Sequence, residues 1–348
     1  MPAALTPFAW RIGYAAREPG FAHADWWTWC GSVIAGTDGR YHLFASRWPR
    51  STPFFNGYLA GSRIVQAVAD TPAGPFAYVR DVLPPTGDGR FDACMTHNPA
   101  ILAWGGQYCL FYIGLRYDPP LPDLHAPFDA WRDIYRRIRI GVAVARTLDG
   151  PFVRQPRPAI DTDVAPWPHM VTTNPAPVVT PDGRVRVYYR TPRQEGDRIR
   201  NVLAAAEADH PLGPYRPLCR EPLLPPEHHL EDPFVWWNGS EYEALAKDLD
   251  GNTAGQWGAA VHLHSADGRR WRIVDPPTAW RRELRFSDGT TMAVGNLERP
   301  WVLLDRAGRP MMLYAAASDH PDGFHKATRT WLAAIELRDK PAMKQERG

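Results

Sequence analysis

One pattern occurs five times in this 348-residue chain: a short apolar strand, a turn that usually contains glycine, and a second apolar strand. The copies span residues 30–47, 97–116, 173–190, 231–247 and 298–318. We take Ser32, Pro99, Pro175, Pro233 and Pro300 as equivalent positions, and the steps between them are then 67, 76, 58 and 67 residues. Five units of about 70 residues fill the chain, so the fold is expected to be built from five similar parts.

A third apolar strand follows each pair, at residues 64–70, 139–146, 202–208, 259–266 and 330–337. Three of these strands run into the same corner, which reads Gly74-Pro75-Phe76, Gly150-Pro151-Phe152 and Gly213-Pro214-Tyr215. Residues 268–271 form a looser fourth copy. Gly and Pro fix the same chain reversal in each unit and the aromatic residue anchors it, so the corners support a true repeat.

The predicted fold is all-β, a five-bladed β-propeller. With 36 Pro and 28 Gly, long helices are unfavourable, and five antiparallel sheets bury their faces only when they form a ring. We expect one domain over 1–348, with blades near 26–80, 92–155, 169–218, 228–275 and 293–338, and with 8–17 completing the last blade. Two β-sandwiches are the alternative, but they do not explain five equal units. Residues 127–137, within an insertion at 117–137, predict a short helix near the funnel rim.

Composition and charge narrow the function. The chain has 40 basic and 38 acidic residues and a formal net charge of +2, which provides no general attraction for nucleic acid or an anionic membrane. The four cysteines show no metal-ligand spacing, and no apolar run is long enough for a membrane span. No signal peptide is visible. We therefore expect a soluble, cytoplasmic protein with a small-molecule partner, and the sequence leaves its oligomeric state open.

Polar residues stand where the inner strands of a propeller begin. These starts read Cys30-Gly31, His97-Asn98, Thr173-Asn174, Glu231-Asp232 and Glu298-Arg299. The second strands return to the same end with Arg47, Arg116, Arg190, Lys247 and Ser318. Strand ends are commonly polar for structural reasons, but such a set around one axis predicts a ligand pocket. The cations would suit an anionic group such as a uronate, sulfate or phosphate, unless they form structural ion pairs.

Five units with Gly-Pro-aromatic corners, and Glu231 two places before a proline at the fourth inner strand, resemble glycoside hydrolase family 43 and its five-bladed relatives. The resemblance covers essentially the whole chain. It implies acid and base carboxylates, assigns the general acid to Glu231, which would need a raised pKa, and allows an axial calcium ion. The family's base and pKa-modulating positions carry no carboxylate here. Asp25 is our first choice for the base, and Asp92 and Glu298 follow.

Tryptophans suit stacking on sugars. Trp26 and Trp167 are the favoured platforms because their neighbours read as loops, whereas Trp29 and Trp104 suit packing between blades. His169 lies just before the third inner strand and could reach the pocket. The expected substrate-binding residues are Trp26, His97, Asn98, His169, Asn174, Arg190, Asp232, Lys247, Glu298 and Arg299.

Three functions follow from this site. The first is a glycoside hydrolase that cleaves a small, optionally anionic, carbohydrate by acid/base catalysis, with Glu231 as acid and no required cofactor. The second is an inverting phosphorylase resembling the mannoside phosphorylases, in which phosphate replaces water and cations bind it. The third is a lyase or a non-catalytic sugar-binding propeller. No phosphate-binding glycine loop, serine elbow or HExxH motif supports other chemistry.

Overall fold

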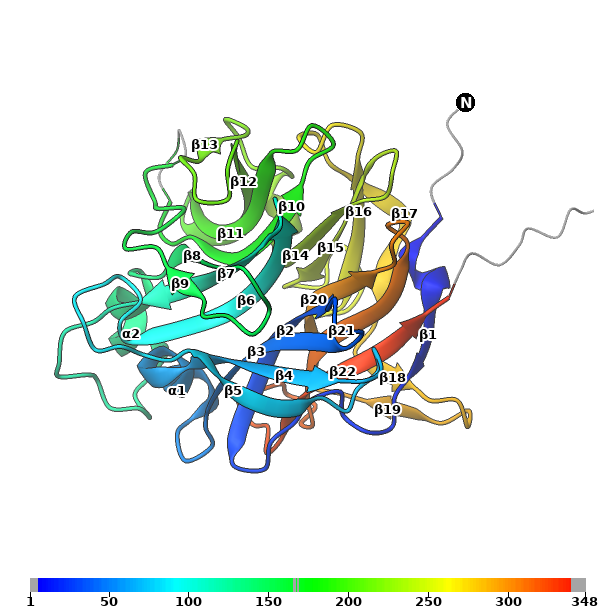
Figure 1. The fold of residues 1–348 in the computed structure, drawn as a ribbon, viewed down its shortest axis with the longest axis horizontal. Helices are drawn as coiled ribbons and strands as arrows, with labels where there is room; N and C mark the ends of the chain where they lie inside the picture. The colour runs from blue at the N-terminus through cyan, green and yellow to red at the C-terminus, as the bar shows by residue number, and fades with distance from the viewer. Residues whose placement is uncertain (1–5, 165–166, 168, 339–348) are drawn as a thin grey trace, which may run out of the picture.

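The computed structural model describes residues 6–164, 167 and 169–338. The described residues form five four-stranded antiparallel sheets arranged in a ring, together with one two-stranded hairpin (Figure 1). This arrangement confirms the predicted five-bladed β-propeller.

Each of the first three blades consists of four consecutive strands. Blade one contains β2 (Trp26–Ala35), β3 (Tyr41–Pro49), β4 (Arg63–Ala69) and β5 (Ala77–Leu83). Blade two contains β6 (Met95–Trp104), β7 (Gln107–Leu115), β8 (Arg139–Ala145) and β9 (Val153–Arg154). Blade three contains β10 (Thr173–Val179), β11 (Val185–Glu195), β12 (Arg198–Ala208) and β13 (Arg216–Pro217).

The last two blades complete the ring. Blade four contains β14 (Leu230–Trp237), β15 (Tyr242–Asp248), β16 (Ala260–Ser265) and β17 (Arg272–Trp280). Blade five contains β20 (Asn296–Leu304), β21 (Pro310–Ser318), β22 (Thr330–Leu337) and, as its outer strand, β1 (Ile12–Ala15). The pairing of β1 with β22 joins the start of the chain to its last blade, as expected for residues 8–17. The hairpin of β18 (Glu283–Arg285) and β19 (Thr291–Ala293) connects blades four and five.

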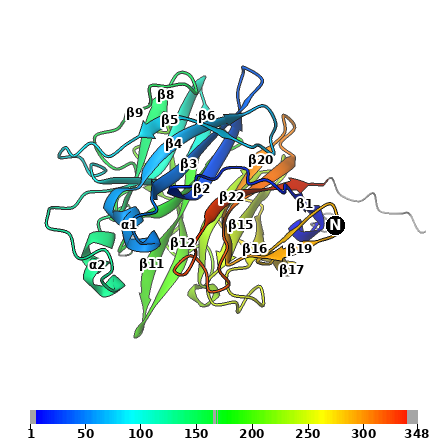
Figure 2. The same ribbon diagram turned by 90° about the horizontal axis from the view of Figure 1, so that it is seen from below.

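Short helices occupy the connections. They are α1 (Phe54–Gly61), between β3 and β4, α2 (Phe128–Tyr135), between β7 and β8, and the 3-10 helices η1 (Phe8–Arg11) and η2 (Pro226–His228). Helix α2 lies where the insertion predicts one, and its Trp131 is fully buried. Figure 2 shows α1, α2 and the end of the β11–β12 hairpin on the same side of the propeller.

The hydrophobic core lies between the blades. Five of the six apolar clusters in the described chain are made mainly of side chains from two neighbouring sheets, such as Phe44 of β3 with Leu110 of β7. The Gly-Pro-aromatic corners end in this core, because Phe76, Phe152 and Tyr215 are buried. Each blade therefore depends on both neighbours to cover its faces.

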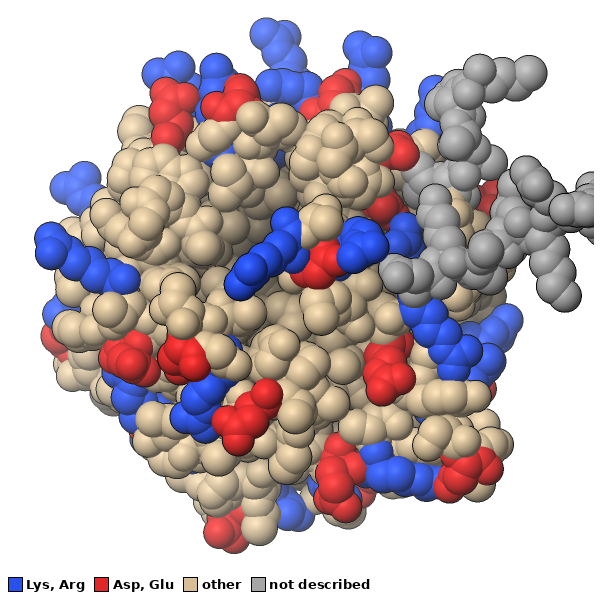
Figure 3. Space-filling model, turned by 45° about the vertical axis from the view of Figure 1, so that its right-hand side comes forward, with Lys and Arg blue, Asp and Glu red and all other residues tan. Residues whose placement is uncertain are grey.

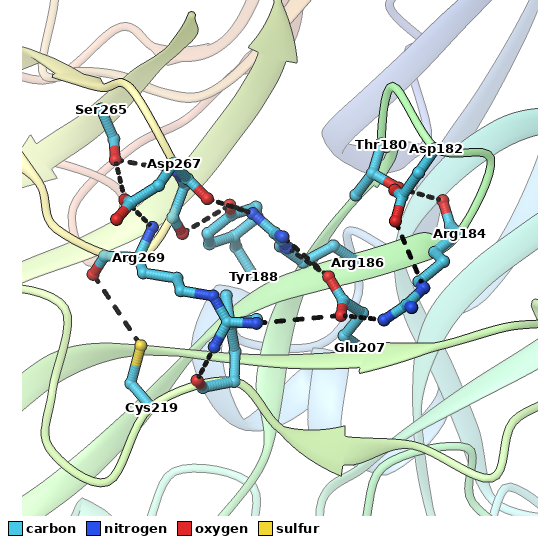
Figure 4. Close-up of polar contacts among 12 residues, drawn as sticks. Thr180, Asp182, Arg184, Arg186, Tyr188, Glu207, Cys219, Ser265, Asp267 and Arg269 are labelled. Atoms are coloured by element: carbon cyan, nitrogen blue, oxygen red, sulfur yellow. Dashed lines mark hydrogen bonds and ion pairs between the residues drawn. The ribbon is translucent and has the colours of Figure 1, made fainter.

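A polar network joins blades three and four near their outer strands (Figure 4). The buried Arg186 of β11 contacts Glu207 of β12 at 2.7 Å and donates to the carbonyl of Asp267 at 3.0 Å. The Tyr188 hydroxyl donates to the carbonyl of Gly268 at 2.8 Å. These bonds tie the loop after β16 to blade three and keep the two blades in register.

The surface carries mixed charge. Basic and acidic side chains are interspersed on the face that Figure 3 shows, in line with the small net charge. Among the described residues, no helix is both long and apolar enough to span a bilayer.

Candidate functional site

Each inner strand contains a β-bulge near its start. The regular pairing of β2, β6, β10, β14 and β20 is interrupted, for example between Glu231 and Phe234. One residue in each bulge has left-handed backbone, with φ between 51° and 58°; these residues are Cys30, Asn98, Asn174, Asp232 and Arg299. Strained residues of this kind persist where the surrounding structure holds them, commonly at functional sites. The bulge re-aims consecutive side chains into two separate layers.

The five left-handed residues line the propeller axis and bond to one another. The Cys30 thiol donates to Asn98 Oδ1 at 2.6 Å, and Asn98 Nδ2 donates to Asn174 Oδ1 at 2.8 Å. Asn174 Nδ2 donates to Asp232 Oδ1, which also lies 2.7 Å from Arg299 Nη1. This axial ring encloses a cavity of about 40 Å³.

The axial ring does not fit a calcium ion. Calcium prefers six to eight oxygen ligands, with carboxylates prominent. The ring offers one carboxylate, that of Asp232, and the Arg299 guanidinium already neutralises it. Among the described residues, no group of three or more His, Cys, Asp or Glu side chains could hold a metal ion. We therefore derive no step through an axial metal.

The residues that precede the left-handed positions line a second, larger cavity. It measures about 270 Å³ and opens above the axial ring; Trp29, His97, Thr173, Glu231 and Glu298 contribute to it, one from each blade. Arg190 and Lys247 reach it from β11 and β15 because they pair with Thr173 and Glu231 in the sheet register. We call this space the funnel cavity.

Aromatic side chains form one wall of the funnel cavity. Trp29 and Trp48 of blade one meet Phe54 of α1 at ring distances of 4.8 and 4.9 Å, and Phe54 stacks on Phe324 of the β21–β22 loop at 4.7 Å. Tyr58 of α1 stacks on His97 at 4.8 Å. This wall offers flat apolar surfaces of the kind that pack against the C–H faces of sugars.

Lys247 joins two carboxylates at the base of the funnel cavity. Its ammonium lies 3.2 Å from Glu231 Oε1 and in closer contact with Glu298 Oε2. Glu298 also accepts a hydrogen bond of 2.9 Å from Asn296. Burial would lower the pKa of Lys247, but Glu298 and Glu231 outweigh it and raise that pKa, so the ammonium stays charged.

Glu231 is ionised in this arrangement. Its burial favours the neutral acid, but Lys247, Arg190 and Arg299 outweigh burial and lower the pKa of Glu231 to about 2. Arg190 Nε lies 3.6 Å from Glu231 Oε2, and Asn201 donates to the same oxygen at 3.3 Å. The pKa of Glu231 is therefore lowered in this structure, not raised as expected.

The neighbouring Asp232 shows the opposite behaviour. Burial raises the pKa of Asp232 to about 7; Arg299 opposes the rise, and the nearby Glu231 and Glu298 add to it. His97 stays neutral, since burial and the positive Arg299 hold its pKa well below the usual value. Its Nδ1 lies 2.8 Å from the Ser62 hydroxyl.

The structure places the predicted residues in several locations. The funnel cavity contains Glu231, His97, Arg190, Lys247 and Glu298. Asn98 and Arg299 line both cavities, whereas Asn174 and Asp232 line only the axial one. The fold therefore gathers nine of the predicted residues around one axis, in two layers.

Asp25, Trp26 and His169 are not brought into the funnel cavity. Asp25 is exposed in a turn before β2, where its carbonyl accepts a hydrogen bond from the amide of Arg50. The Arg47 guanidinium lies over the Trp26 ring, with its central carbon 4.2 Å from the ring centre. His169 is buried and bonds the Tyr189 hydroxyl at 2.9 Å through Nε2. Asp25 and Trp26 precede the bulge of blade one by several residues, so the bulge does not turn their side chains toward the cavity.

Other candidate residues serve structural pairs. Buried Asp92 contacts Arg154 at 3.0 Å and accepts a hydrogen bond from Tyr112, so it is no candidate for the base. Arg47 pairs with Asp81 at 2.8 Å, and exposed Arg116 lies 3.3 Å from Asp118. In these blades the register positions equivalent to Arg190 and Lys247 belong to Ser46, which pairs with Trp29, and Ile113, which pairs with His97; each arginine lies beyond them.

Four of the cavity residues outside the predicted set lie beside the charged groups or the aromatic wall. Trp257 comes from the loop after β15, and its ring centre lies 5.6 Å from Lys247 Nζ. Tyr58, Tyr135 and Asn201 come from α1, α2 and β12. Asn201 follows from extending the β11–β12 hairpin, but the other three lie in connections that the repeat does not describe.

Comparison with known proteins rests on structure, because neither a protein-family model nor a curated protein matches the chain. Zg3597, a family 117 glycoside hydrolase of the marine bacterium Zobellia galactanivorans, superposes with a TM-score of 0.70 at 16% identity, over 95% of this chain and 92% of that one. A GH43_1 enzyme from Xanthomonas citri gives 0.58 at 16% identity, over 94% and 91%. The chain shares the five-bladed propeller fold of these proteins. The expected resemblance to family 43 is confirmed at the level of this fold.

Proposed function

We propose that this propeller is a glycoside hydrolase for a small carbohydrate, with Glu231 as general acid and Glu298 as base. The observation that carries the proposal is the pair of buried carboxylates, on adjacent blades, that share Lys247 at the base of a cavity with an aromatic wall. The structural neighbours support it: several are glycoside hydrolases, and one family 43 neighbour forms a complex with xylotriose.

The two carboxylates would take different roles because Lys247 lies closer to Glu298 than to Glu231. The ammonium is closer to Glu298, which suits an ionised base that removes a proton from water. Lys247 is also the largest influence that lowers the pKa of Glu231. When a glycosidic oxygen displaces this ammonium from Glu231 Oε1, the positive charge that lowers the pKa of Glu231 is weakened. Burial then raises the pKa of Glu231, so the protonated acid forms while the substrate is bound.

Cleavage by the inverting course needs the two carboxyls about 6.5–9.5 Å apart, with room for water. Glu231 and Glu298 now contact the same ammonium, so the substrate that displaces Lys247 from Glu231 also has to separate them to this distance. Glu231 gives its proton to the leaving oxygen while the bond from that oxygen to the anomeric carbon breaks. Water attacks the same carbon from the opposite face, and Glu298 accepts the proton that water releases. Trp257 at the rim offers an indole face for the sugar.

The decisive experiment compares leaving groups in a Glu231→Gln variant. A screen of aryl glycosides and uronides first identifies the accepted glycone. Loss of a general acid is expected to lower kcat/KM for an alkyl glycoside by about 10²–10⁴-fold, whereas the glycosyl fluoride, which departs without a proton, keeps near wild-type turnover. Asp25→Asn, a change of an exposed carboxylate, serves as control and leaves both substrates unaffected. Equal losses on both substrates would refute the acid role.

A phosphorylase is the second candidate, and two observations favour it. Trp29 stands in blade one at the position equivalent to Glu231, and three cations line the funnel cavity. Phosphate bound by Arg190, Lys247 or Arg299 would attack the anomeric carbon directly, with no need for a base. Turnover that requires added phosphate and releases a glycosyl phosphate would replace the hydrolase proposal. Turnover indifferent to phosphate would exclude this candidate.

A further inference from the structure

A third cavity adjoins the funnel cavity, and most of its lining side chains are apolar. It measures about 330 Å³ and lies between α2, the β11–β12 hairpin and the base of α1. Five residues line both this cavity and the funnel cavity, so the two spaces adjoin each other: Phe55, Tyr135, Arg190, Asn201 and His325. We call it the side groove.

Exposed apolar residues from distant parts of the chain meet at the side groove. Phe128 of α2 is 42% exposed and Ile199 of β12 is 52% exposed, although both line it. Met170 and Pro192 add to the same surface. Apolar side chains left open to water in a concave site generally mark a binding surface.

The walls of the side groove are aromatic. Phe55 and Phe128 meet edge to face at 5.6 Å, and Phe128 meets Tyr135 in the same way at 5.4 Å. The Tyr135 hydroxyl accepts a hydrogen bond of 2.5 Å from Arg190, which fixes this ring at the border with the funnel cavity. Rings in such a cluster offer faces and edges for a further aromatic ring.

Several polar groups of the side groove already contact protein partners. Asn201 accepts from Arg190 at 3.2 Å and donates to Glu231 at 3.3 Å. The arginines of α2 pair along their own helix, Arg132 with Asp129 and Arg136 with Asp133 at 3.4 Å. A sugar ring there would have to compete for these groups to satisfy its hydroxyls, whereas an apolar ring would not.

We propose that the side groove binds an aromatic aglycone, which makes an aryl glycoside the substrate class of this protein. The inference rests on the proposed function, since it places the leaving group of a sugar held in the funnel cavity. Tyr135, Arg190 and Asn201 line both spaces, and Asn201 donates to Glu231, so an aglycone held at Glu231 lies next to the side groove. Recognition then comes from ring packing on Phe55, Phe128 and Ile199.

Kinetics with matched substrates test this proposal. Ile199→Asp and Phe128→Ala are each expected to lower kcat/KM for a 4-nitrophenyl glycoside roughly tenfold or more, the scale on which an apolar pocket discriminates. Both should leave the glycosyl fluoride of the same sugar unchanged, because fluoride does not reach the side groove. Val153→Asp alters a comparably exposed residue on β9 and should have no effect. Unchanged aryl glycoside kinetics in both groove variants would overturn the proposal.

Binding of 4-nitrophenol alone separates this inference from the proposed function. Calorimetry at a pH where the phenol is uncharged should detect binding to the wild type and its loss in Ile199→Asp. Failure of the wild type to bind would overturn the side groove as an aryl site, whatever the turnover. Binding of the phenol by a protein that cleaves no glycoside would retain the aryl site and refute the hydrolase.

Discussion

Replacing Lys247 by glutamine is expected to change the way the stability of this protein depends on pH. In the native protein the pKa of Glu231 is about 2, below its ordinary value of 4.5. A carboxyl with a lowered native pKa contributes stability that is fully present above about pH 4.5 and is lost as the pH falls toward 2. Between pH 5 and 7 Glu231 therefore adds no slope to the stability of the wild type.

Without the ammonium, Glu231 and Glu298 share a buried site with less compensation. Loss of one partner of a buried ion pair costs about 3–5 kcal/mol, and one of the two carboxyls then binds a proton with a pKa above 4.5. The native state of the variant holds more protons than the unfolded chain, so its stability falls as the pH rises. One proton gives at most about 1.4 kcal/mol per pH unit, or up to about 2.7 kcal/mol between pH 5 and 7.

Denaturant unfolding at several pH values, compared with the wild type, measures this effect. Asp232, whose pKa is raised to about 7, adds a slope of the same sign. Lys247 is among the groups that lower the pKa of Asp232, so its removal raises that pKa further, and the difference between the two curves reports the summed change at the carboxyls around Lys247. Lys326→Gln removes an exposed lysine that pairs with Asp322 at 2.7 Å, and this control should stay within about 0.5 kcal/mol of the wild type. A Lys247→Gln curve parallel to that of the wild type would refute our account of the electrostatics.

Two further predictions concern other parts of the funnel. Trp257→Ala should raise KM for the accepted glycoside more than it lowers kcat, because the indole at the rim contacts bound sugar and not the reacting bond; steady-state kinetics would show a fall confined to kcat if this is wrong. Cys30 should resist a thiol reagent in the native protein, since it is buried and burial raises its pKa; the native thiol count should therefore be the same in Cys30→Ser as in the wild type, and a lower count would contradict the axial ring.

The fold could be predicted because its determinants are local and repeated. Each blade carries its own strands, and three blades carry the same Gly-Pro-aromatic corner, so five weak patterns reinforce one another. The pairing of β1 with β22 followed from the need of the last sheet for an outer strand. Chain segments outside the repeat, such as the loop that contains Trp257, had no comparable pattern and could not be placed.

The site could be predicted only in part because a bulge decides where each side chain points. Four blades have a proline directly after the left-handed residue, but blade one has Gly31 there, and the equivalent of the prolines is Gly31 and not Ser32. The first step in the repeat is thus 68 residues, from Cys30 to Asn98. A shift of one residue exchanges the two layers, so the funnel position of blade one belongs to Trp29.

This register has a consequence for the proposed chemistry. Since Trp29 fills the funnel position of blade one, the second carboxylate has to come from another blade, and Glu298 holds the equivalent position in blade five. Blades four and five are neighbours, so one lysine on β15 can contact both carboxylates, which it could not do if they faced each other across the axis. In the proposed reaction, a substrate that displaces the ammonium from Glu231 leaves it on Glu298, and this one movement allows the pKa of Glu231 to rise.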